Sequence, residues 1–402
     1  PPRCMALLAV VSRVRAAAAH GARGARAQRA MGGGLSRRVA TFAASGSFRP
    51  DSPTLYSDAD ADDSSFLASK TALVTGPTSG LGAALVRSWA TLPQAQRPRR
   101  CVLVARNADK ARETASALEA AGIEAATYIC DLSAPVEVLR TAKEIAAAEP
   151  VLDICCLNAG AWLVDPAPVL DADGLEAHYR LNFLHMVCFV QELTPLLARS
   201  AKASGGESRI CVHGSYTGMY FSKGELDIDN LKTSDPARYK LAGNIEGSFP
   251  YSQTKLAQHV WCKAMAGKLP EGVTINVACP GSVPDTSLPA WATFKQLSGF
   301  LWPVLQFMTG ARSSDEGVQP LAHLCGAAAM TGVSGTFLDW GHTTKQLQKN
   351  EPAPLEQYPT QRKAAPTTSD DAAVERLFAE TSAVINELRA HHGLESAPAI
   401  EE

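Results

Sequence analysis

Short apolar runs alternate along the chain with stretches whose apolar residues recur at helical spacing. The apolar runs predict strands at 71–76, 101–106, 125–132, 152–160, 208–215 and 273–281. The stretches with helical spacing predict helices at 81–92, 108–122, 136–149 and 174–197, and a further helix that begins near Tyr251. Strands that are apolar nearly throughout and alternate with helices indicate a parallel sheet buried on both faces. The pattern therefore predicts a single α/β domain with a doubly wound parallel sheet over residues 66–345.

The segments outside this domain differ from it in composition. Residues 346–371 are rich in proline, so we expect a linker there. Residues 372–390 predict a helix with one apolar face, which should dock on the domain. That face holds Val374, Leu377, Phe378, Val384, Ile385 and Leu388. Residues 51–65 are polar and acidic and predict a second linker.

Charge is distributed unevenly between the first residues and the rest of the chain. The net charge is −2 over 402 residues, but residues 1–50 hold nine Arg and no Lys, Asp or Glu. A basic, alanine-rich segment without acids is typical of an organelle transit peptide, and both plastid and mitochondrion fit. An arm for nucleic acid is disfavoured, because the segment lacks Lys and no basic or aromatic platform accompanies it. We expect no nucleic-acid partner.

Ten cysteines are scattered along the chain, without a C-x-x-C pair or the paired spacing of a metal site. Cys155 and Cys156 are neighbours in an apolar strand and should face opposite sides of the sheet. We expect buried thiols in a reducing compartment, and no metal site. No transmembrane span is predicted either, because the apolar run at 300–308 is short and contains Pro303.

A glycine-rich loop, TGPTSGLG at 75–82, joins the first predicted strand to the first helix. Gly76 permits the tight turn, Gly80 removes a side chain where a pyrophosphate would lie, and Gly82 lets the helix pack close to the sheet. Backbone N–H groups at the helix N-terminus would then hold the phosphates. A plain strand–helix turn is the alternative, but the place of the loop favours a dinucleotide site of the Rossmann type.

The end of the second strand indicates which dinucleotide fits. An NAD-specific site needs an acid there to hold the ribose hydroxyls, whereas this strand ends in Ala105, Arg106 and Asn107. The Arg106 guanidinium can bind a 2′-phosphate, which favours NADPH, although a solvated surface charge is the alternative for this residue. Asp131 closes the third strand and could accept a hydrogen bond from the adenine amino group or stabilise a turn.

Taken in order, these motifs are typical of one family, and the chain resembles the short-chain dehydrogenase/reductases over residues 70–345. The motifs are T-G-x-x-x-G-x-G at 75–82, D-L at 131–132, N-A-G at 158–160, a helix asparagine at Asn182, a strand-end serine at Ser215, Y-x-x-x-K from Tyr251 to Lys255, and P-G at 280–281. The cofactor-binding residues that the resemblance implies are Gly76, Thr78, Ser79, Gly80, Leu81, Gly82, Arg106, Asp131, Leu132, Asn158, Ala159, Gly160, Tyr251, Lys255, Pro280, Gly281 and Val283. Together with the Arg at the second strand, the resemblance implies NADP(H) as the cofactor.

The finer resemblance is to retinol-dehydrogenase-like and protochlorophyllide-reductase-like members. It is carried by YSQTKLAQ at 251–258, the long segment between Ser215 and Tyr251, SSDEGVQPLAHL at 313–324, and VSGTFLDW at 333–340. Such members usually show P-G-x-V-x-T, whereas this chain has PGSVPDT, with one extra residue before its threonine. The resemblance therefore does not extend to a contact between that threonine and the nicotinamide amide.

Tyr251 and Lys255 stand four residues apart, so they lie on one face of the predicted helix. Hydride transfer to a carbonyl leaves negative charge on its oxygen, and Tyr251 could supply a proton there if its pKa falls from about 10 towards neutrality. The Lys255 charge favours phenolate and would lower that pKa. The resemblance further implies that Ser215 hydrogen-bonds the carbonyl oxygen, that Lys255 also holds the nicotinamide ribose, and that Asn182 holds a water in a proton relay. Asn158 is expected to stabilise the central strand.

The sequence leaves the substrate open. The segment 282–310 is rich in Trp, Phe and Leu, and the corresponding region covers the substrate in this family. That favours a lipophilic carbonyl or alcohol, or peripheral contact with a membrane, although a core-packing helix pair fits equally. Two other functions stay open: reduction of a tetrapyrrole double bond, as in protochlorophyllide-reductase-like enzymes, and a non-catalytic NADPH-binding subunit of an organelle complex. Members of the family often form homodimers, and a homodimer is compatible with this sequence.

Overall fold

The computed structural model describes residues 66–239, 246–286, 311–339, 360–361 and 365–398. The expected transit peptide at 1–50 and the linker at 51–65 lie outside these residues. Most of the apolar segment at 282–310 also lies outside them.

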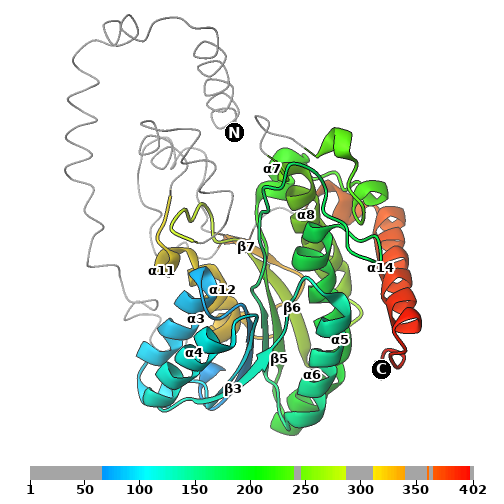
Figure 1. The fold of residues 1–402 in the computed structure, drawn as a ribbon. Coiled ribbons are helices and arrows are strands. Elements are labelled where there is room, and N and C mark those ends of the chain that lie inside the picture. The colour runs from blue at the N-terminus through cyan, green and yellow to red at the C-terminus, as the bar shows by residue number, and fades with distance from the viewer. Residues whose placement is uncertain (1–65, 240–245, 287–310, 340–359, 362–364, 399–402) are drawn as a thin grey trace, which may run out of the picture.

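A parallel sheet forms the centre of the described part (Figure 1). Its strands in chain order are β1 (Thr71–Thr75), β2 (Arg100–Ala105), β3 (Glu124–Ile129), β4 (Ile154–Leu157), β5 (Ser208–His213), β6 (Val273–Ala278), β7 (Phe337–Asp339) and β8 (Thr360–Gln361). Across the sheet they lie in the order β3-β2-β1-β4-β5-β6-β7-β8, and every neighbouring pair is parallel except β7 and β8. The chain moves outward from β1 to β3, returns to the centre at β4 and then continues in the other direction. The prediction of a doubly wound parallel sheet is confirmed.

Helices cover both faces of this sheet (Figure 1). On one side lie α3 (Gly80–Thr91), α4 (Ala108–Ala120), α11 (Ser314–Gly317) and α12 (Gln319–Gly326). On the other lie α5 (Pro135–Ala148), α6 (His185–Ser204), α8 (Ser248–Met265) and α14 (Asp371–His391). A π-helix, η3 (Tyr179–Leu184), runs directly into α6, and α7 (Thr217–Phe221) follows β5. Single 3₁₀ turns complete the described elements: η2 (Gln94–Gln96), η4 (Ile228–Asn230), η5 (Pro236–Arg238), η7 (Ala328–Met330) and η9 (Pro366–Ser369).

Two hydrophobic clusters, one on each face, bury the strands on both sides. Successive strand residues alternate between them, so that Leu73 packs in one cluster and Val74 in the other. Cys155 and Cys156 divide in the same way, which confirms their expected opposite orientation. The nine cysteines among the described residues are all buried and free, as the scattered spacing predicts.

The C-terminal helix α14 packs against α8 and α5 (Figure 1). Its buried side chains Val374, Leu377, Val384, Ile385 and Leu388 join the larger hydrophobic cluster. Phe378 stacks on Trp261 of α8, with ring centroids 5.3 Å apart. The predicted docking of this helix through its apolar face is confirmed. Within the expected linker at 346–371, Thr367 is buried and its hydroxyl donates to the Gly224 carbonyl oxygen over 2.7 Å, so this part is anchored to the domain.

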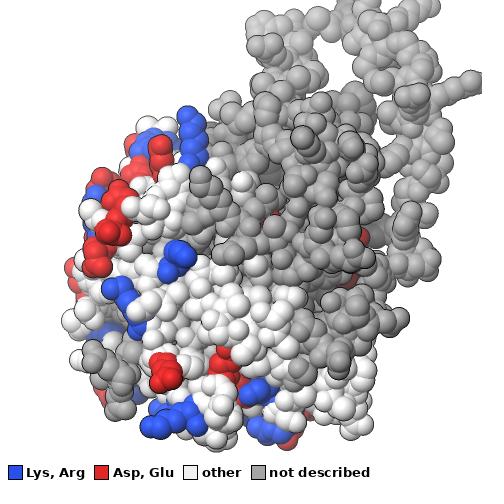
Figure 2. Space-filling model, turned by 180° about the vertical axis from the view of Figure 1, so that it is seen from behind, with Lys and Arg blue, Asp and Glu red and all other residues white. Residues whose placement is uncertain are grey.

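The segment Tyr179–Ser204, formed by η3 and α6, is long and apolar enough to cross a membrane. However, 78% of its most apolar window is buried inside the protein, as in a core helix of a soluble domain. On the face seen in Figure 2, the Lys and Arg side chains of the described residues lie among Asp and Glu side chains rather than in one basic area.

Candidate active site

The predicted site residues gather at the edge of the sheet where the parallel strands end. The glycine-rich loop follows β1, the N-A-G motif follows β4, and Ser215 follows β5. The order of strands reverses at β1, because β1 pairs with β2 on one side and with β4 on the other. Ligands of doubly wound sheets bind in the crevice at such a point.

The loop after β1 has the backbone that a pyrophosphate cradle requires. Gly76 and Gly80 both have positive φ, +66° and +52°, which residues with a side chain rarely adopt. A Cβ on Gly82 would lie 2.1 Å from the Gly76 carbonyl oxygen, so only glycine fits there. Thr78 and Ser79 complete the turn, and Leu81 lies in the first turn of α3. Ser79 is the N-cap residue but makes no side-chain capping bond, which leaves backbone N–H groups of that helix end for an anion.

Asn158, at the end of β4, connects this loop to β5. Its amide nitrogen donates to the carbonyl oxygen of Thr75 over 3.0 Å, and its amide oxygen lies 2.8 Å from Nδ1 of His213. The adjacent Ala159 backbone N–H donates to the Thr75 hydroxyl over 3.0 Å. Asn158 therefore holds three strand ends in register beside the glycine-rich loop.

Gly160, Asn182 and Lys255 meet on the other side of the N-A-G motif. A Cβ on Gly160 would lie 2.9 Å from Oδ1 of Asn182 and 3.3 Å from Nζ of Lys255. The Lys255 ammonium donates to the carbonyl oxygen of His213 over 2.8 Å. Burial lowers the pKa of Lys255 to about 8. The loop after β4, the π-helix and α8 thus converge on one buried cation.

Asn182 lies inside the π-helix η3, a form of helix that is frequent at functional sites. Its Oδ1 accepts from the Ala161 backbone N–H over 2.8 Å, and its Nδ2 donates to the Ala161 carbonyl oxygen over 2.9 Å. Its own carbonyl oxygen accepts from Nε2 of Gln258 over 2.6 Å. Asn182 therefore fixes the loop that follows the N-A-G motif, a contact that the resemblance alone did not imply.

Tyr251 is nearly buried, with 8% of its surface exposed, and Ser215 lies beside it. Ser215 Oγ accepts from the backbone N–H and the hydroxyl of Thr217, over 3.3 and 3.1 Å. Its own hydrogen is therefore available to the phenol oxygen or to a substrate oxygen. Burial raises the pKa of Tyr251 above its usual value, while the hydrogen bond with Ser215 lowers it. The sequence led us to expect a pKa near neutrality, but burial outweighs the lowering contribution here.

Three aromatic and charged residues around Tyr251 were missed in the sequence. Trp162 stacks on the Tyr251 ring, with centroids 5.0 Å apart and planes at 13°. The edge of His178 faces the same ring at 6.5 Å. His178 accepts at Nε2 from the Leu163 backbone N–H over 3.0 Å, so its Nδ1 carries the hydrogen and donates to Glu176 over 2.7 Å. Glu176 and His178 are both fully buried, so this pair supports the wall of the Tyr251 site.

The ends of β2, β3 and β6 carry the remaining predicted residues. Arg106 directly follows β2 and is exposed. Asp131 follows β3 and accepts at Oδ1 from the backbone N–H and the hydroxyl of Ser133, over 2.9 and 2.8 Å, while its neighbour Leu132 is buried. Beyond β6, the backbone turns at Pro280 and Gly281 and continues to Val283, which is buried, and Thr286. The Thr286 methyl group lies 3.5 Å from the place of a Cβ on Gly80, so this segment covers the glycine-rich loop.

The buried Lys255 should lower stability at neutral pH. Its folded-state pKa of about 8 lies below the unfolded value of about 10.4, because burial disfavours the charged ammonium. The resulting loss of folding stability is fully present below about pH 8 and becomes smaller as pH rises towards 10.4. We expect Lys255→Met to raise the free energy of unfolding at pH 7 by about 1–3 kcal/mol, after allowing for the lost bond to His213. Urea titrations of both proteins at several pH values measure the difference, which should shrink above about pH 8. A methionine variant that is less stable at pH 7 would contradict this account.

Comparison with known proteins places this arrangement in a family. The family model for short chain dehydrogenase matches residues 70–224. The chain is 29% identical to polyprenol dehydrogenase of Mus musculus over 280 residues, which is 67% of this chain and 75% of that protein. It is 28% identical to retinol dehydrogenase 14 of Homo sapiens over 308 residues, 68% of this chain and 79% of that protein.

A solved structure resembles the fold. The Pseudomonas aeruginosa RhlG/NADP active-site complex superposes with a TM-score of 0.51 at 25% identity, covering 68% of this chain and 95% of that one. The matched part of this chain contains the glycine-rich loop and the N-A-G motif, and the fold places Tyr251 and Lys255 beside them. The chain therefore belongs to the short-chain dehydrogenase/reductase family of oxidoreductases and has retinol-dehydrogenase-like relatives.

Proposed function

We propose that this protein is an NADPH-dependent oxidoreductase that transfers hydride to or from a lipophilic carbonyl or alcohol, with Tyr251 as the general acid or base. One observation carries the proposal: Gly160, Asn182 and Lys255 meet beside Tyr251 and Ser215, next to a loop shaped for a pyrophosphate. An acid, a cation and a hydroxyl group at the reversal point of a doubly wound sheet are the groups that carbonyl reduction needs.

The described residues fit a phosphorylated dinucleotide. The space at Gly82 excludes a side chain, which lets the backbone approach a pyrophosphate. At the end of β2, Arg106 is exposed where an NAD-specific site would hold an acid, and its guanidinium suits a 2′-phosphate. The RhlG structure, which is similar to this chain, is a complex with NADP. NADP(H) is therefore the proposed cofactor.

Each side chain of the site has a separate role in the proposed reduction of a carbonyl. When bound, NADPH supplies the hydride in the direction of reduction. Tyr251 then gives its proton to the carbonyl oxygen, because burial keeps the phenol protonated until negative charge develops on that oxygen. Ser215 donates a hydrogen bond to the same oxygen, and Lys255 stabilises the phenolate that remains. Asn182 keeps the neighbouring loop in place through its two bonds to Ala161.

Two observations support a lipophilic substrate. Two relatives are named as dehydrogenases of polyprenol and retinol, which are both lipophilic alcohols. In this chain, the indole of Trp162 forms an apolar wall against the Tyr251 ring. An apolar wall beside the proton donor suits a substrate with little polar surface.

NADPH oxidation by the purified chain tests the proposal. The assay is run in the dark against retinal, long-chain aldehydes, small ketones and quinones. We expect turnover with at least one lipophilic aldehyde and slower turnover with small ketones. Tight NADPH binding without turnover on any carbonyl would contradict the proposed reaction and would favour a pigment reductase or a non-catalytic subunit.

Substitution of the exposed arginine after β2 tests the choice of cofactor. Arg106→Ala should weaken NADPH binding by about 10-fold or more, because a hydrogen bond to a charged group contributes about 1.5–3 kcal/mol. Binding of NADH should change little, since NADH lacks the 2′-phosphate. Fluorescence titration with both nucleotides measures the two affinities. Arg199→Ala is the control, because Arg199 is also exposed but lies near the C-terminal end of α6, at the opposite edge of the sheet. An equal loss for both nucleotides would remove Arg106 from the 2′-phosphate site.

The location in the cell is a separate part of the proposal. The arginine-rich, acid-free composition of residues 1–50 supports delivery to a plastid or a mitochondrion. A fluorescent protein fused behind residues 1–65 should accumulate in one of these organelles, and a diffuse signal would contradict this assignment.

A further inference from the structure

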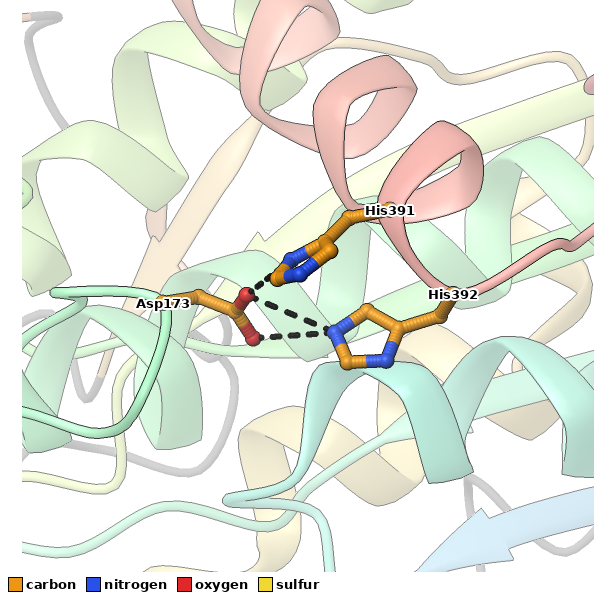
Figure 3. Close-up of side chains that lie close together, drawn as sticks. All are labelled: Asp173, His391 and His392. Atoms are coloured by element: carbon orange, nitrogen blue, oxygen red, sulfur yellow. Dashed lines mark hydrogen bonds and ion pairs between the residues drawn. The ribbon is translucent and has the colours of Figure 1, made fainter.

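A cluster of two histidines and one aspartate lies away from the candidate active site. Figure 3 shows Asp173, from the loop before η3, pointing at His391 and His392 at the end of α14. One ligand atom from each of the three residues lies within 4.8 Å of the other two. Within the described residues, this is the one group of three or more His, Cys, Asp or Glu side chains that meets this spacing.

The distances in the cluster match those between ligands of a single cation. His391 Nδ1 lies 3.0 Å from Oδ1 of Asp173, and His392 Nε2 lies 3.2 Å from its Oδ2 (Figure 3). Zinc binds imidazole nitrogen and carboxylate oxygen at about 2.0–2.2 Å, so ligand atoms around a tetrahedral ion lie about 3.3 Å apart. A cation can therefore bind once side-chain movement brings the two imidazole nitrogens, which lie within 4.8 Å of each other, to this spacing.

The loop that carries Asp173 is held in place by its own hydrogen bonds. Asp171 Oδ1 accepts from the backbone N–H groups of Asp173 and Leu175, over 3.1 and 2.9 Å. Asp171 also pairs through Oδ2 with Nε of Arg180 at 3.3 Å. The Asp173 side chain is 19% exposed and is thus partly shielded from water. The carboxylate is presented to the histidines by a preformed turn.

The end of α14 adds a second favourable feature. His391 is the last residue of this helix and His392 is its C-cap. The backbone carbonyl groups at a helix C-terminus carry partial negative charge, which attracts a cation. Both imidazoles reach the carboxylate from this end, so the helix dipole and the Asp173 charge act on the same point.

We propose that Asp173, His391 and His392 form a binding site for a divalent transition-metal cation such as Zn²⁺. Two imidazole nitrogens and one carboxylate oxygen are a ligand set that suits Zn²⁺, and Ca²⁺ and Mg²⁺ prefer oxygen ligands alone. Water would complete the coordination. The bound cation joins the C-terminal helix to the loop that continues into Glu176 and His178, and the His178 ring lies 6.5 Å from the Tyr251 ring. Without the cation, the same groups form His–Asp hydrogen bonds.

Calorimetric titration of the full chain with ZnCl₂ tests the site. The protein carries no polyhistidine tag, and the titration is done at about pH 7.5, since metal affinity depends on pH. We expect one equivalent of Zn²⁺ to bind, and Asp173→Asn and His392→Gln each to weaken binding about 10-fold or more. Glu395→Gln is the control, because it removes a nearby exposed carboxylate, paired with Lys143, that is not in the cluster.

Two results would overturn the proposal. The first is the absence of Zn²⁺ binding at micromolar protein concentration. The second is binding that both ligand variants retain, which would place the ion elsewhere. The absorption spectrum of the protein with Co²⁺ shows whether the ion is bound by a cysteine instead. Coordination by a cysteine adds a strong thiolate-to-metal band, which the proposed ligands do not produce. The three ligands are at the surface or partly exposed, so their variants should remain folded.

Discussion

Tyr251→Phe should lower turnover of a carbonyl substrate with NADPH by about 10²-fold or more, the usual contribution of a general acid. The substitution removes the hydroxyl and keeps the ring. The phenyl group can still stack on Trp162 and meet the edge of His178, so the wall of the site should persist. Ser215 alone cannot replace the proton, because its hydroxyl is far less acidic than a phenol.

The affinity for NADPH separates a chemical effect from a structural one. Binding should stay within a few-fold of wild type in Tyr251→Phe, as measured by fluorescence titration of the purified proteins. Tyr239→Phe is a matched control, because Tyr239 is another buried tyrosine in the same region and also faces His178, at 6.3 Å. Loss of turnover in both variants would indicate damage to packing. Unchanged turnover in Tyr251→Phe would exclude it as the proton donor.

The sheet could be predicted from the sequence because its strands are buried on both faces. The run CVLVA at 101–105 has no polar face and is buried throughout, as is typical of a strand in a parallel sheet between two helix layers. The predicted strand ends differ from those in the structure where a functional motif directly follows the strand. The strand predicted at 152–160 ends at Leu157, because Asn158 turns its side chain to the glycine-rich loop.

The helix predicted at 174–197 was less well defined by its apolar spacing. In the structure, the loop around Asp171 extends to Leu175, and the π-helix η3 precedes α6. Most residues between Tyr179 and Val190 are apolar and buried, so the apolar spacing gave no signal for a wider turn. The insertion places the Asn182 side chain against Ala161, and it is therefore part of the candidate site.

The site residues that the sequence did not reveal are defined by contacts between segments far apart in the chain. Trp162 and the Glu176–His178 pair act through contacts between distant segments, and no short motif contains them. A buried acid and histidine in an otherwise apolar stretch were the available signal, since such groups are rarely buried without partners. Asp173 and His391 are 218 positions apart, so no spacing rule could join them.

Gly82→Ala should weaken NADPH binding by about 10-fold or more and should also lower the melting temperature. The new Cβ would lie 2.1 Å from the Gly76 carbonyl oxygen and 2.5 Å from Nδ2 of Asn158. Both atoms belong to the network that holds the loop, in which Asn158 donates to Thr75, so neither can move freely. Overpacking of this kind costs about 1–3 kcal/mol of folding free energy. A loop that the new methyl group displaces no longer fits the pyrophosphate, and a loss of about 1.4 kcal/mol in binding is a 10-fold change in affinity.

Gly267→Ala provides the comparison for that experiment. A Cβ on Gly267 would lie 3.9 Å from its nearest neighbour, the carbonyl oxygen of Ala264, so the same methyl group is accommodated there. Fluorescence titration with NADPH and thermal unfolding should leave this control close to wild type. If Gly82→Ala kept full affinity while it remained folded, the loop would have to make room for the new methyl group at no cost. A loop that yields so easily could not be the rigid pyrophosphate cradle, and the nucleotide would have to be held chiefly by Arg106 and Lys255.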